Sequence, residues 1–187
     1  MSDAPIRVFA LSGSLRQASY NTATLRAMAA RAPKSVEVTV ATCHDVPLYN
    51  PDTAQGAPPP AVAAIAEGMR QANAVVLCSP EYNYSISGVL KNTIDWLSRA
   101  DPQPFDDKVV AILGASPGLF GTARAQYQLR QMLIYLNARL VNKPEVMIGA
   151  AHTKFDDDGN LTDETTAAFL DKLLRAAIDL SRRLASD

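Results

Sequence analysis

The sequence predicts an α/β protein, a three-layer α/β/α sandwich built on one open parallel sheet of five strands. Five short apolar runs alternate with five segments whose apolar residues recur at helical spacing. Each connection between successive strands is long enough to contain a helix, as a crossover between parallel strands requires. For five strands the common winding gives the order 2-1-3-4-5. With 187 residues, the chain fits one domain spanning residues 1–187.

The predicted strands are short and differ in polarity. They are residues 6–11, 36–41, 74–78, 109–113 and 146–148, and residues 139–141 could form the first part of the fifth. The nearly continuous apolar character of residues 6–11 indicates a parallel strand covered on both faces. Residues 74–78 (AVVLC) are the most apolar and are therefore predicted to be central. Residues 36–41 (VEVTVA) alternate in polarity, as a strand at or near the edge would.

The predicted helices are marked by apolar spacing and by residues that start or stop helices. Three of them span about residues 21–32, 88–99 and 162–185. Another begins near Pro60 and carries apolar residues as far as Met69, and one follows residues 115–121 with Leu129, Met132, Leu133 and Leu136. The first ends before Pro33, which cannot continue a helix comfortably, and Pro60 suits a first turn. The last is predicted to start with Thr162 and Asp163.

A long irregular stretch, residues 42–60, separates the second strand from the second helix. It contains Val46, Leu48 and Tyr49 among several prolines. A connection this long is usually functional or covers something, so we expect its apolar residues to fold down onto the domain. It is not predicted to be a domain linker.

Composition and charge exclude several classes of function. A formal net charge of -1 and a pI near 6.1 argue against a nucleic-acid binder, which needs a basic face. Cys43 and Cys78 have no metal or redox spacing, and Cys78 fits a buried, inert thiol. The run DDDGN at residues 156–160 lacks the acidic ligands of an EF-hand and is interpreted as a solvated turn, so no metal is expected. The N-terminal apolar run is much too short for a signal peptide or a membrane span, which favours a cytoplasmic protein.

The loop after the first strand, SGSLRQASYN at residues 12–21, carries a set of groups suited to an anion. It leads into a helix N-terminus, where free amide groups and the helix dipole attract negative charge. Arg16 adds a planar fork of donors that fits a phosphate. With the single glycine Gly13, the loop matches neither GxGxxG nor the P-loop, which favours a terminal phosphate over a pyrophosphate. The predicted contacts are Ser12, Gly13, Ser14, Arg16, Ser19, Asn21 and Thr22. The alternative is a polar turn with a capping serine.

Two further loops are expected beside the first, because ligands of such sheets bind at the carboxyl ends of the strands around the switch point. Residues 79–84 (SPEYNY) follow the third strand, and residues 115–121 (ASPGLFG) follow the fourth. The first of these suits a flat heteroaromatic ring, with main-chain donors along its edge and apolar contact on its face. The candidate residues are Pro80, Glu81, Tyr82, Asn83, Tyr84, Ser116 and Gly118. The alternative is a turn in which Tyr82 and Tyr84 cover the core.

Taken together, these motifs resemble the NADPH-dependent FMN reductase family, in particular its quinone and chromate reductase branch. The resemblance covers nearly the whole chain and is carried by four stretches: GSLRxxSxN at 13–21, PEYNYSISGVLKNTIDW at 80–96, SPG at 116–118 and AQYQLRQ at 125–131. It implies a flavodoxin-like fold and bound FMN. Ser14, Arg16, Ser19 and Asn21 match phosphate contacts, Pro80 to Asn83 match residues along the isoalloxazine ring, and Ser116 matches a further flavin contact. Thr122, where a second glycine is frequent, and Pro117 depart from the pattern.

The activity that the resemblance implies is an FMN-dependent NAD(P)H oxidoreductase working by a ping-pong cycle. Hydride passes from NADPH or NADH to N5 of bound FMN, and electrons then pass to a small-molecule acceptor. Quinones are the first choice of acceptor, and azo dyes, chromate and free flavin are others. No catalytic side chain is expected, and neither His44 nor His152 lies in a recognisable nucleophile context.

Two other classes of function stay open at this point. One is a flavodoxin-like electron carrier that binds FMN for a partner protein, although such carriers are typically strongly acidic and this chain is nearly neutral. The other is a flavin-free scaffold or sensor on the same fold.

The resemblance also implies self-association into a homodimer or homotetramer. Tyr84, Arg124, Tyr127 and Glu145 lie in or near the ligand-side loops and the fourth helix, where a neighbouring subunit could pair with them. The alternative is that these residues form a solvated surface.

Overall fold

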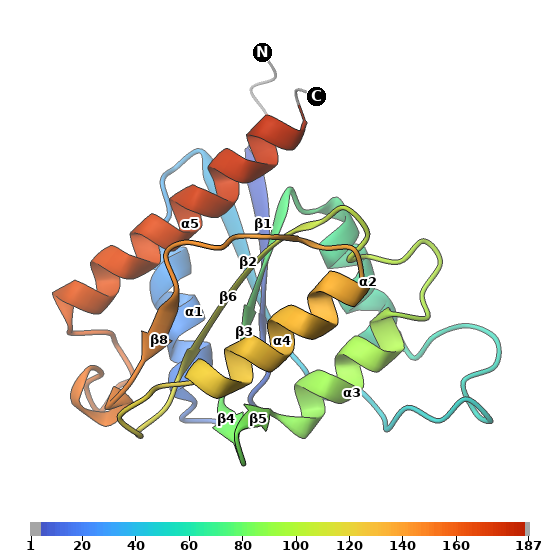
Figure 1. The fold of residues 1–187 in the computed structure, drawn as a ribbon, viewed down its shortest axis with the longest axis horizontal. Helices are drawn as coiled ribbons and strands as arrows, with labels where there is room; N and C mark the ends of the chain where they lie inside the picture. Colours follow the sequence, from blue (N-terminus) through green and yellow to red (C-terminus); the bar gives the residue numbers. More distant parts are fainter. Residues whose placement is uncertain (1–4, 186–187) are drawn as a thin grey trace.

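One parallel sheet forms the middle layer of the computed structural model, which describes residues 5–185. Its strands are β1 (Ile6–Ser12), β2 (Val36–Thr42), β3 (Ala74–Cys78), β6 (Val109–Ala115), β7 (Arg139–Leu140) and β8 (Val146–Ile148). They lie in the order β2-β1-β3-β6-β7, β8 also pairs with β6, and helices cover both faces (Figure 1). This confirms the predicted order 2-1-3-4-5, with β6 as the fourth strand. Residues 1–4 and 186–187 of the predicted domain lie outside the described residues.

The fifth strand of the prediction is broken into two parts. β7 pairs with Val109 and Val110 at the start of β6, and β8 pairs with residues 113–115 at its end. Residues 139–140 are therefore the first part of the fifth strand, the alternative that the sequence allowed. Pro144 lies between the two parts and has no N–H to donate to a neighbouring strand, which accounts for a break in this region.

Side chains cap the first turns of three of the α-helices among residues 5–185. The helices are α1 (Tyr20–Arg31), α2 (Pro60–Gln71), α3 (Gly88–Leu97), α4 (Ala123–Tyr135) and α5 (Glu164–Leu184), with a 3-10 turn η1 (Ala151–Thr153). Ser19 caps α1, Ser87 caps α3 and Asp163 caps α5. Because Asp163 is a cap, α5 starts two residues later than the predicted Thr162, and α3 ends at Leu97 rather than at residue 99.

The sheet separates two hydrophobic cores, because successive residues of a strand point to opposite faces. Phe9 and Leu11 of β1 pack with residues of α2, α3 and α4. Val8 and Ala10 of the same strand pack with residues of α1 and α5. All of β3 is buried, which confirms that the most apolar run is a central strand. The edge position of β2 likewise agrees with its alternating polarity.

The long segment between β2 and α2 folds onto α3, as expected. The Tyr49 ring packs edge-on against Trp96, with ring centroids 5.1 Å apart. The Pro47 carbonyl accepts hydrogen bonds of 2.8 Å from Trp96 Nε1 and from Asn92 Nδ2. The expectation for Leu48 was wrong, because its side chain is 85% exposed. Its two neighbours are held by α3, so the intervening side chain points outward.

A short hairpin replaces the simple loop expected at residues 79–84. β4 (Glu81–Tyr82) and β5 (Ser85–Ile86) form an antiparallel pair joined by Asn83 and Tyr84. These two residues have φ values of 52° and 67°, the left-handed conformation that a two-residue hairpin needs at both positions. Asn is favoured there but Tyr is not, so the hairpin had only a weak sequence signal.

Candidate functional site

The three predicted loops meet at one edge of the sheet. β1, β3 and β6 run side by side in register, with Ser12 opposite Cys78 and Cys78 opposite Leu113. Beyond the strand ends, Gly13 N donates to Cys78 O at 2.8 Å and Ser79 N donates to Leu113 O at 3.2 Å. The β4–β5 hairpin and the segment leading into α4 lie at the same, lower edge in Figure 1. The convergence expected from the winding is therefore present.

The first loop folds back onto the first turn of α1, and its small polar side chains are almost completely buried. Ser12, Ser14, Ser19, Asn21 and Thr22 are each at most 6% exposed. The hydroxyls of Ser12 and Thr22 lie 2.8 Å apart, and Ser19 Oγ accepts from Thr22 N at 3.2 Å. The loop therefore has a fixed shape. It leads to the first N–H groups of α1, which have no partner within the helix, as at every helix N-terminus.

Arg16 differs from its neighbours because its side chain is exposed and uncommitted. Within residues 5–185 its guanidinium makes no ion pair and no hydrogen bond, and its main-chain N–H donates to Ser14 Oγ at 3.4 Å. A free guanidinium beside a helix N-terminus provides the charge and the donors that a phosphate needs.

Asn21 points inward rather than toward solvent. Its Oδ1 accepts hydrogen bonds from Ala115 N at 2.9 Å and from Cys78 Sγ at 3.3 Å, and its Nδ2 donates to Ala115 O at 3.0 Å. The side chain thus joins the start of α1 to the ends of β3 and β6. Cys78 is buried, as predicted, and burial raises the pKa of its thiol well above the ordinary value.

The second loop carries two exposed tyrosine rings and one carboxylate that is bonded within the protein. Pro80 is buried, whereas Tyr82 is 50% and Tyr84 is 63% exposed, so the two tyrosines do not cover the core. Glu81 Oε2 accepts from Ala125 N in the first turn of α4 at 3.0 Å. The carboxylate therefore joins the hairpin to a helix N-terminus, where negative charge is favourable.

An arginine is stacked between two exposed rings beside this hairpin. The Arg124 guanidinium lies 4.2 Å from the Tyr84 ring centroid and 5.0 Å from that of Phe120. It also lies 3.5 Å from Glu81 Oε1. The stack connects the second loop, the third loop and α4.

The third loop is held by the segment that follows β8. Ser116 N donates to Ile148 O at 2.9 Å, and Ala151 N donates to Ser116 O at 3.0 Å. Ser116 Oγ accepts from Gly118 N at 3.1 Å, and Gly118 is exposed. Gly121 has a φ of 60° and lies so close to the β8 backbone that an added Cβ would be 2.8 Å from a carbonyl carbon of Met147. The loop is therefore held at its two ends, by Ser116 and by Gly121, against β8 and the segment that follows it.

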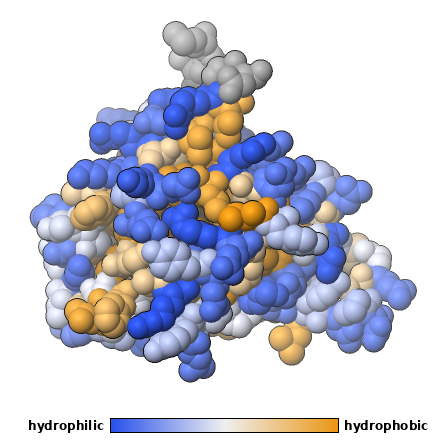
Figure 2. Space-filling view, viewed as in Figure 1, coloured by the Kyte–Doolittle hydropathy of each residue, from blue (hydrophilic) through white to orange (hydrophobic). Residues whose placement is uncertain are grey.

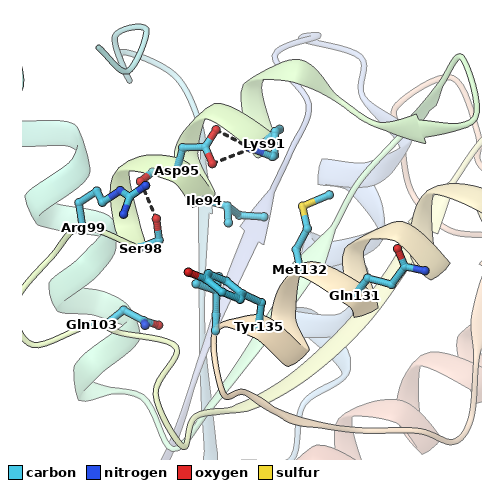
Figure 3. Close-up of a pocket in the computed structure, with 10 residues that line it drawn as sticks. Lys91, Ile94, Asp95, Ser98, Arg99, Gln103, Gln131, Met132 and Tyr135 are labelled. Atoms are coloured by element: carbon cyan, nitrogen blue, oxygen red, sulfur yellow. Dashed lines mark hydrogen bonds and ion pairs between the residues drawn. The ribbon is translucent and has the colours of Figure 1, made fainter. Parts of the chain in front are cut away.

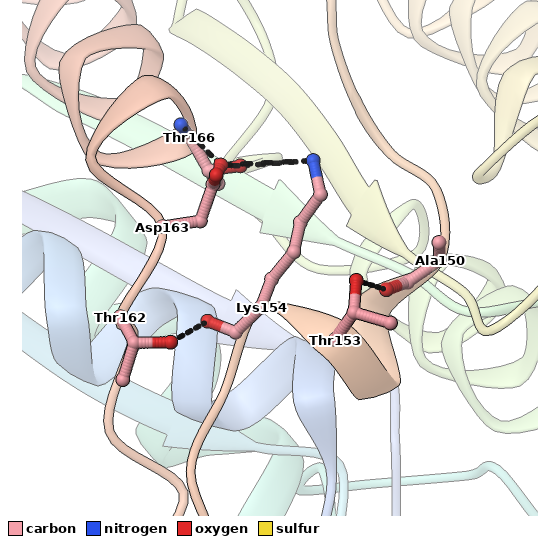
Figure 4. A network of polar contacts seen from close by, with 6 residues as sticks. All are labelled: Ala150, Thr153, Lys154, Thr162, Asp163 and Thr166. Atoms are coloured by element: carbon pink, nitrogen blue, oxygen red, sulfur yellow. Dashed lines mark hydrogen bonds and ion pairs between the residues drawn. The ribbon is translucent and has the colours of Figure 1, made fainter.

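The segment after β8 is in turn fixed by a network of polar contacts at the start of α5 (Figure 4). Thr153 Oγ1 donates to Ala150 O at 2.9 Å, and Lys154 Nζ donates to Thr166 Oγ1 at 3.2 Å. Asp163 Oδ1 accepts from Thr166 N at 2.8 Å and lies 3.7 Å from Lys154 Nζ. Hydrogen bonds from Thr166, followed by the charge of Lys154, lower the pKa of Asp163.

The sequence prediction missed Ser87 and gave Thr122 no role. Ser87 Oγ donates to Gly13 O at 2.5 Å and accepts from Leu90 N at 3.3 Å, so it joins the first loop to α3. A serine immediately before a helical apolar pattern is a cap signal that could have identified it. Thr122 is fully buried against Gly114, and a Cβ added at Gly114 would clash with the Thr122 hydroxyl.

A separate hollow of about 530 Å³ lies between α3 and α4, away from these loops (Figure 3). None of the predicted site residues lines it. Its walls include Lys91 and Asp95, which form an ion pair at 2.6 Å, and the side chains of Met132 and Tyr135.

The described residues were also searched for metal-binding groups and for helices that could cross a membrane. No group of three His, Cys, Asp or Glu side chains among residues 5–185 is placed to hold a metal ion. No helix in this range is both long and apolar enough to cross a bilayer.

The fold and the site define a class of protein. An open parallel sheet in the order 2-1-3-4-5, with helices on both faces and three loops meeting at the carboxyl ends of its strands, is the flavodoxin-like arrangement.

Comparison with known proteins identifies the family. A family model described as NADPH-dependent FMN reductase matches residues 6–153. The chain is 48% identical over 184 residues to an NAD(P)H-dependent FMN reductase of Pseudomonas aeruginosa, covering 98% of this chain and 99% of that protein. It is 44% identical over 182 residues to a quinone reductase of Escherichia coli, covering 96% and 97% of the two chains.

A solved structure agrees with the sequence relatives. The flavoenzyme NAD(P)H:(acceptor) oxidoreductase FerB of Paracoccus denitrificans superposes with a TM-score of 0.84 at 32% identity, over 95% of this chain and 98% of that one. The chain belongs to the NADPH-dependent FMN reductase family, as the sequence motifs predicted, and it is an oxidoreductase.

Proposed function

We propose that this chain is a single-domain, FMN-dependent NAD(P)H oxidoreductase that passes electrons to quinones. The observation that carries the proposal is the uncommitted Arg16 guanidinium beside a buried serine loop and a helix N-terminus, next to two loops with exposed tyrosines. The names of the relatives support the same activity.

The residues of the first loop fit the phosphate of FMN. Arg16 would supply charge and a fork of donors, and Ser14 and Ser19 would supply hydroxyls. The free amide groups of the first turn of α1 would complete the set. Ser12, Gly13 and Thr22 would hold the loop in this shape, since Ser12 and Thr22 are already bonded to each other. An added Cβ at Gly13 would lie 2.9 Å from Leu90 Cβ, so a larger residue at this position would clash with α3.

The residues of the second and third loops fit the isoalloxazine ring. Pro80, Tyr82, Asn83 and Tyr84 would lie along one side of the ring, and Ser116 and Gly118 would lie on the other. Glu81 is held by α4 and would position the hairpin. When bound, FMN supplies hydride acceptance from NAD(P)H and electron donation to the acceptor. The chain's own residues orient the ring and leave one face open, so donor and acceptor can occupy the same place in turn.

A quinone is the proposed acceptor because it is flat and can stack where a nicotinamide stacks. Exposed aromatic side chains such as Tyr82 are suited to contact such a ring. Azo dyes, chromate and free flavin are the acceptors to be compared with quinones in the assay. An electron carrier would instead be expected to show a strong acidic surface, and the net charge of the chain is only -1.

The test is an absorbance spectrum of the purified protein, followed by anaerobic titration with NADPH and with NADH. We expect a bound-flavin spectrum that bleaches on addition of nicotinamide and returns on addition of a quinone. A colourless protein that stays colourless with added FMN would favour a flavin-free scaffold. A flavin that binds but is not reduced by either nicotinamide would favour an electron carrier.

We also propose self-association through the α4 side of the ligand loops. Leu119, Phe120, Tyr127 and Tyr135 are each more than half exposed. A hydrophobic patch at the lower left of Figure 2 lies over the segment before α4, among otherwise hydrophilic residues. Such aromatic residues with a neighbouring arginine are typical of interface cores.

Light scattering tests this proposal. We expect a dimer or a tetramer at micromolar protein and a smaller species for Tyr127→Glu. Glu145 lies 3.8 Å from Arg130 within the chain and could also pair with a neighbouring subunit. A wild-type monomer would contradict the proposal.

We further propose a cytoplasmic location, which suits the two unpaired cysteines and which cell fractionation would test.

A further inference from the structure

The side chain of Asn21 pairs with a backbone peptide that lies 94 residues away in the sequence. Ala115 N donates to Asn21 Oδ1 at 2.9 Å, and Asn21 Nδ2 donates to Ala115 O at 3.0 Å. The two bonds close a ring. The side-chain amide of Asn21 bonds the N–H and C=O of Ala115 as the backbone of a neighbouring strand would. Cys78 Sγ adds a third contact, to Oδ1 at 3.3 Å.

These contacts leave Asn21 little capacity for a ligand. An asparagine amide has one oxygen with two lone pairs and two N–H donors. Both acceptor positions and one N–H are used within the protein, and the residue is only 4% exposed. The neighbouring Arg16 shows the opposite pattern, with an exposed side chain and no internal partner among residues 5–185.

The pair joins the two ends of the proposed FMN site. Asn21 belongs to the first turn of α1, at the phosphate end. Ala115 is the last residue of β6 and immediately precedes Ser116, at the ring end. On its other side the first loop is bonded to α3 through Ser87 and Gly13. Single side chains therefore connect the first loop to the end of β6, next to the third loop, and to the start of α3.

We propose that Asn21 is a positioning residue that sets the third loop relative to the phosphate loop, rather than a phosphate contact. The proposal rests on the function proposed above. Loss of the side-chain amide would free the Ala115 peptide and change the place of Ser116 against the ring. Loss of a phosphate contact would lower affinity without changing the surroundings of the ring.

The experiment compares Asn21→Ala with Arg16→Ala, using FMN as the probe and two readouts. The dissociation constant comes from quenching of flavin fluorescence, and the visible circular dichroism of the flavin is recorded at saturation. We expect Arg16→Ala to bind FMN roughly 10- to 30-fold more weakly, which is the effect of one charged hydrogen bond. Asn21→Ala is also expected to bind FMN more weakly, because the third loop no longer holds its place beside the ring. Only Asn21→Ala is expected to change the dichroism of the saturated flavin.

Asn21→Asp supplies a second test that does not depend on a truncated side chain. The protonated acid can accept from Ala115 N and donate to Ala115 O, whereas the ionised acid cannot donate. We therefore expect the dichroism of saturated Asn21→Asp to be close to wild type at low pH and to depart from it as the pH rises through the pKa of the new carboxyl. Wild type should show no such change. This variant decides the question if Asn21→Ala fails to fold.

The outcomes separate this proposal from the one on which it rests. Wild-type protein that binds no FMN would overturn the proposed function. If wild type binds FMN and Asn21→Ala lowers affinity with an unchanged dichroism, as Arg16→Ala does, Asn21 is a phosphate contact and the positioning role is wrong. The positioning role is also wrong if Asn21→Asp shows a dichroism independent of pH.

Discussion

Replacement of Arg16 by alanine is the most direct perturbation of the proposed phosphate site. The Arg16 side chain is exposed and has no internal partner among residues 5–185. Its removal therefore leaves no buried group without a hydrogen bond, and the variant should unfold at the same urea concentration as wild type. The whole effect is expected in ligand binding.

The magnitude follows from the exposure of this side chain. A hydrogen bond to a charged group is worth about 1.5–3 kcal/mol, and solvent and salt reduce the value for an exposed group. We take the lower end, about 1.5–2 kcal/mol, which corresponds to an increase of roughly 10- to 30-fold in the dissociation constant for FMN. The difference between variant and wild type should shrink as salt is added, because the interaction is screened.

The assay is quenching of flavin fluorescence at low and high salt, with two further variants. Arg26→Ala is the matched control, since Arg26 is an exposed arginine on α1, the helix into which the first loop leads, and lies outside the proposed site. Arg16→Lys keeps the charge but loses the planar fork, so its affinity should fall between those of wild type and Arg16→Ala. An affinity of Arg16→Ala equal to that of Arg26→Ala would refute the phosphate assignment.

Three further predictions concern stability, measured by urea unfolding. Lys108 Nζ donates to Ala72 O at 2.6 Å at the end of α2, so Lys108→Met should cost about 2 kcal/mol, and an unchanged midpoint would contradict this. Asp163→Ala should cost about 1 kcal/mol at neutral pH through loss of the α5 cap. The pKa of Asp163 is lowered in the folded state, so this stabilisation is complete above the ordinary carboxyl pKa and is lost as the pH falls through the lowered value. A loss of stability in Asp163→Ala that does not depend on pH would contradict this prediction. Tyr84 has a φ of 67°, so Tyr84→Gly should be about 1 kcal/mol more stable than Tyr84→Ala, which retains the strain, and the reverse order would disprove it.

Most of the fold could be predicted because its signals are local. The run at residues 74–78 is apolar at every position, and only a strand covered on both faces buries all of it. The caps Ser19 and Asp163 lie immediately before apolar patterns, so the helix starts were predicted to within two residues. The β4–β5 hairpin was missed because its turn places Tyr84 in a conformation that tyrosine disfavours.

The roles of individual site residues were harder to predict, because they depend on distant partners. The sequence places Asn21 beside Arg16 in one polar loop, and nothing local shows that one points inward and the other outward. The direction of Asn21 is set by the N–H and C=O groups of Ala115, which lies 94 residues further along the chain. These groups lie beyond the last residue of β6 that pairs with β3, so no strand satisfies them on that side. Ser87 likewise acts on Gly13, 74 residues away.

The contact between Tyr49, Pro47 and Trp96 also provides an intrinsic probe. Trp96 is the only tryptophan of the chain, and its indole is 8% exposed beneath the segment that leads from β2 to α2. The emission wavelength of the protein therefore reports on one environment, and separation of this segment from α3 would admit water to the indole and shift the emission to the red. The docking of one long connection can thus be followed in unlabelled protein.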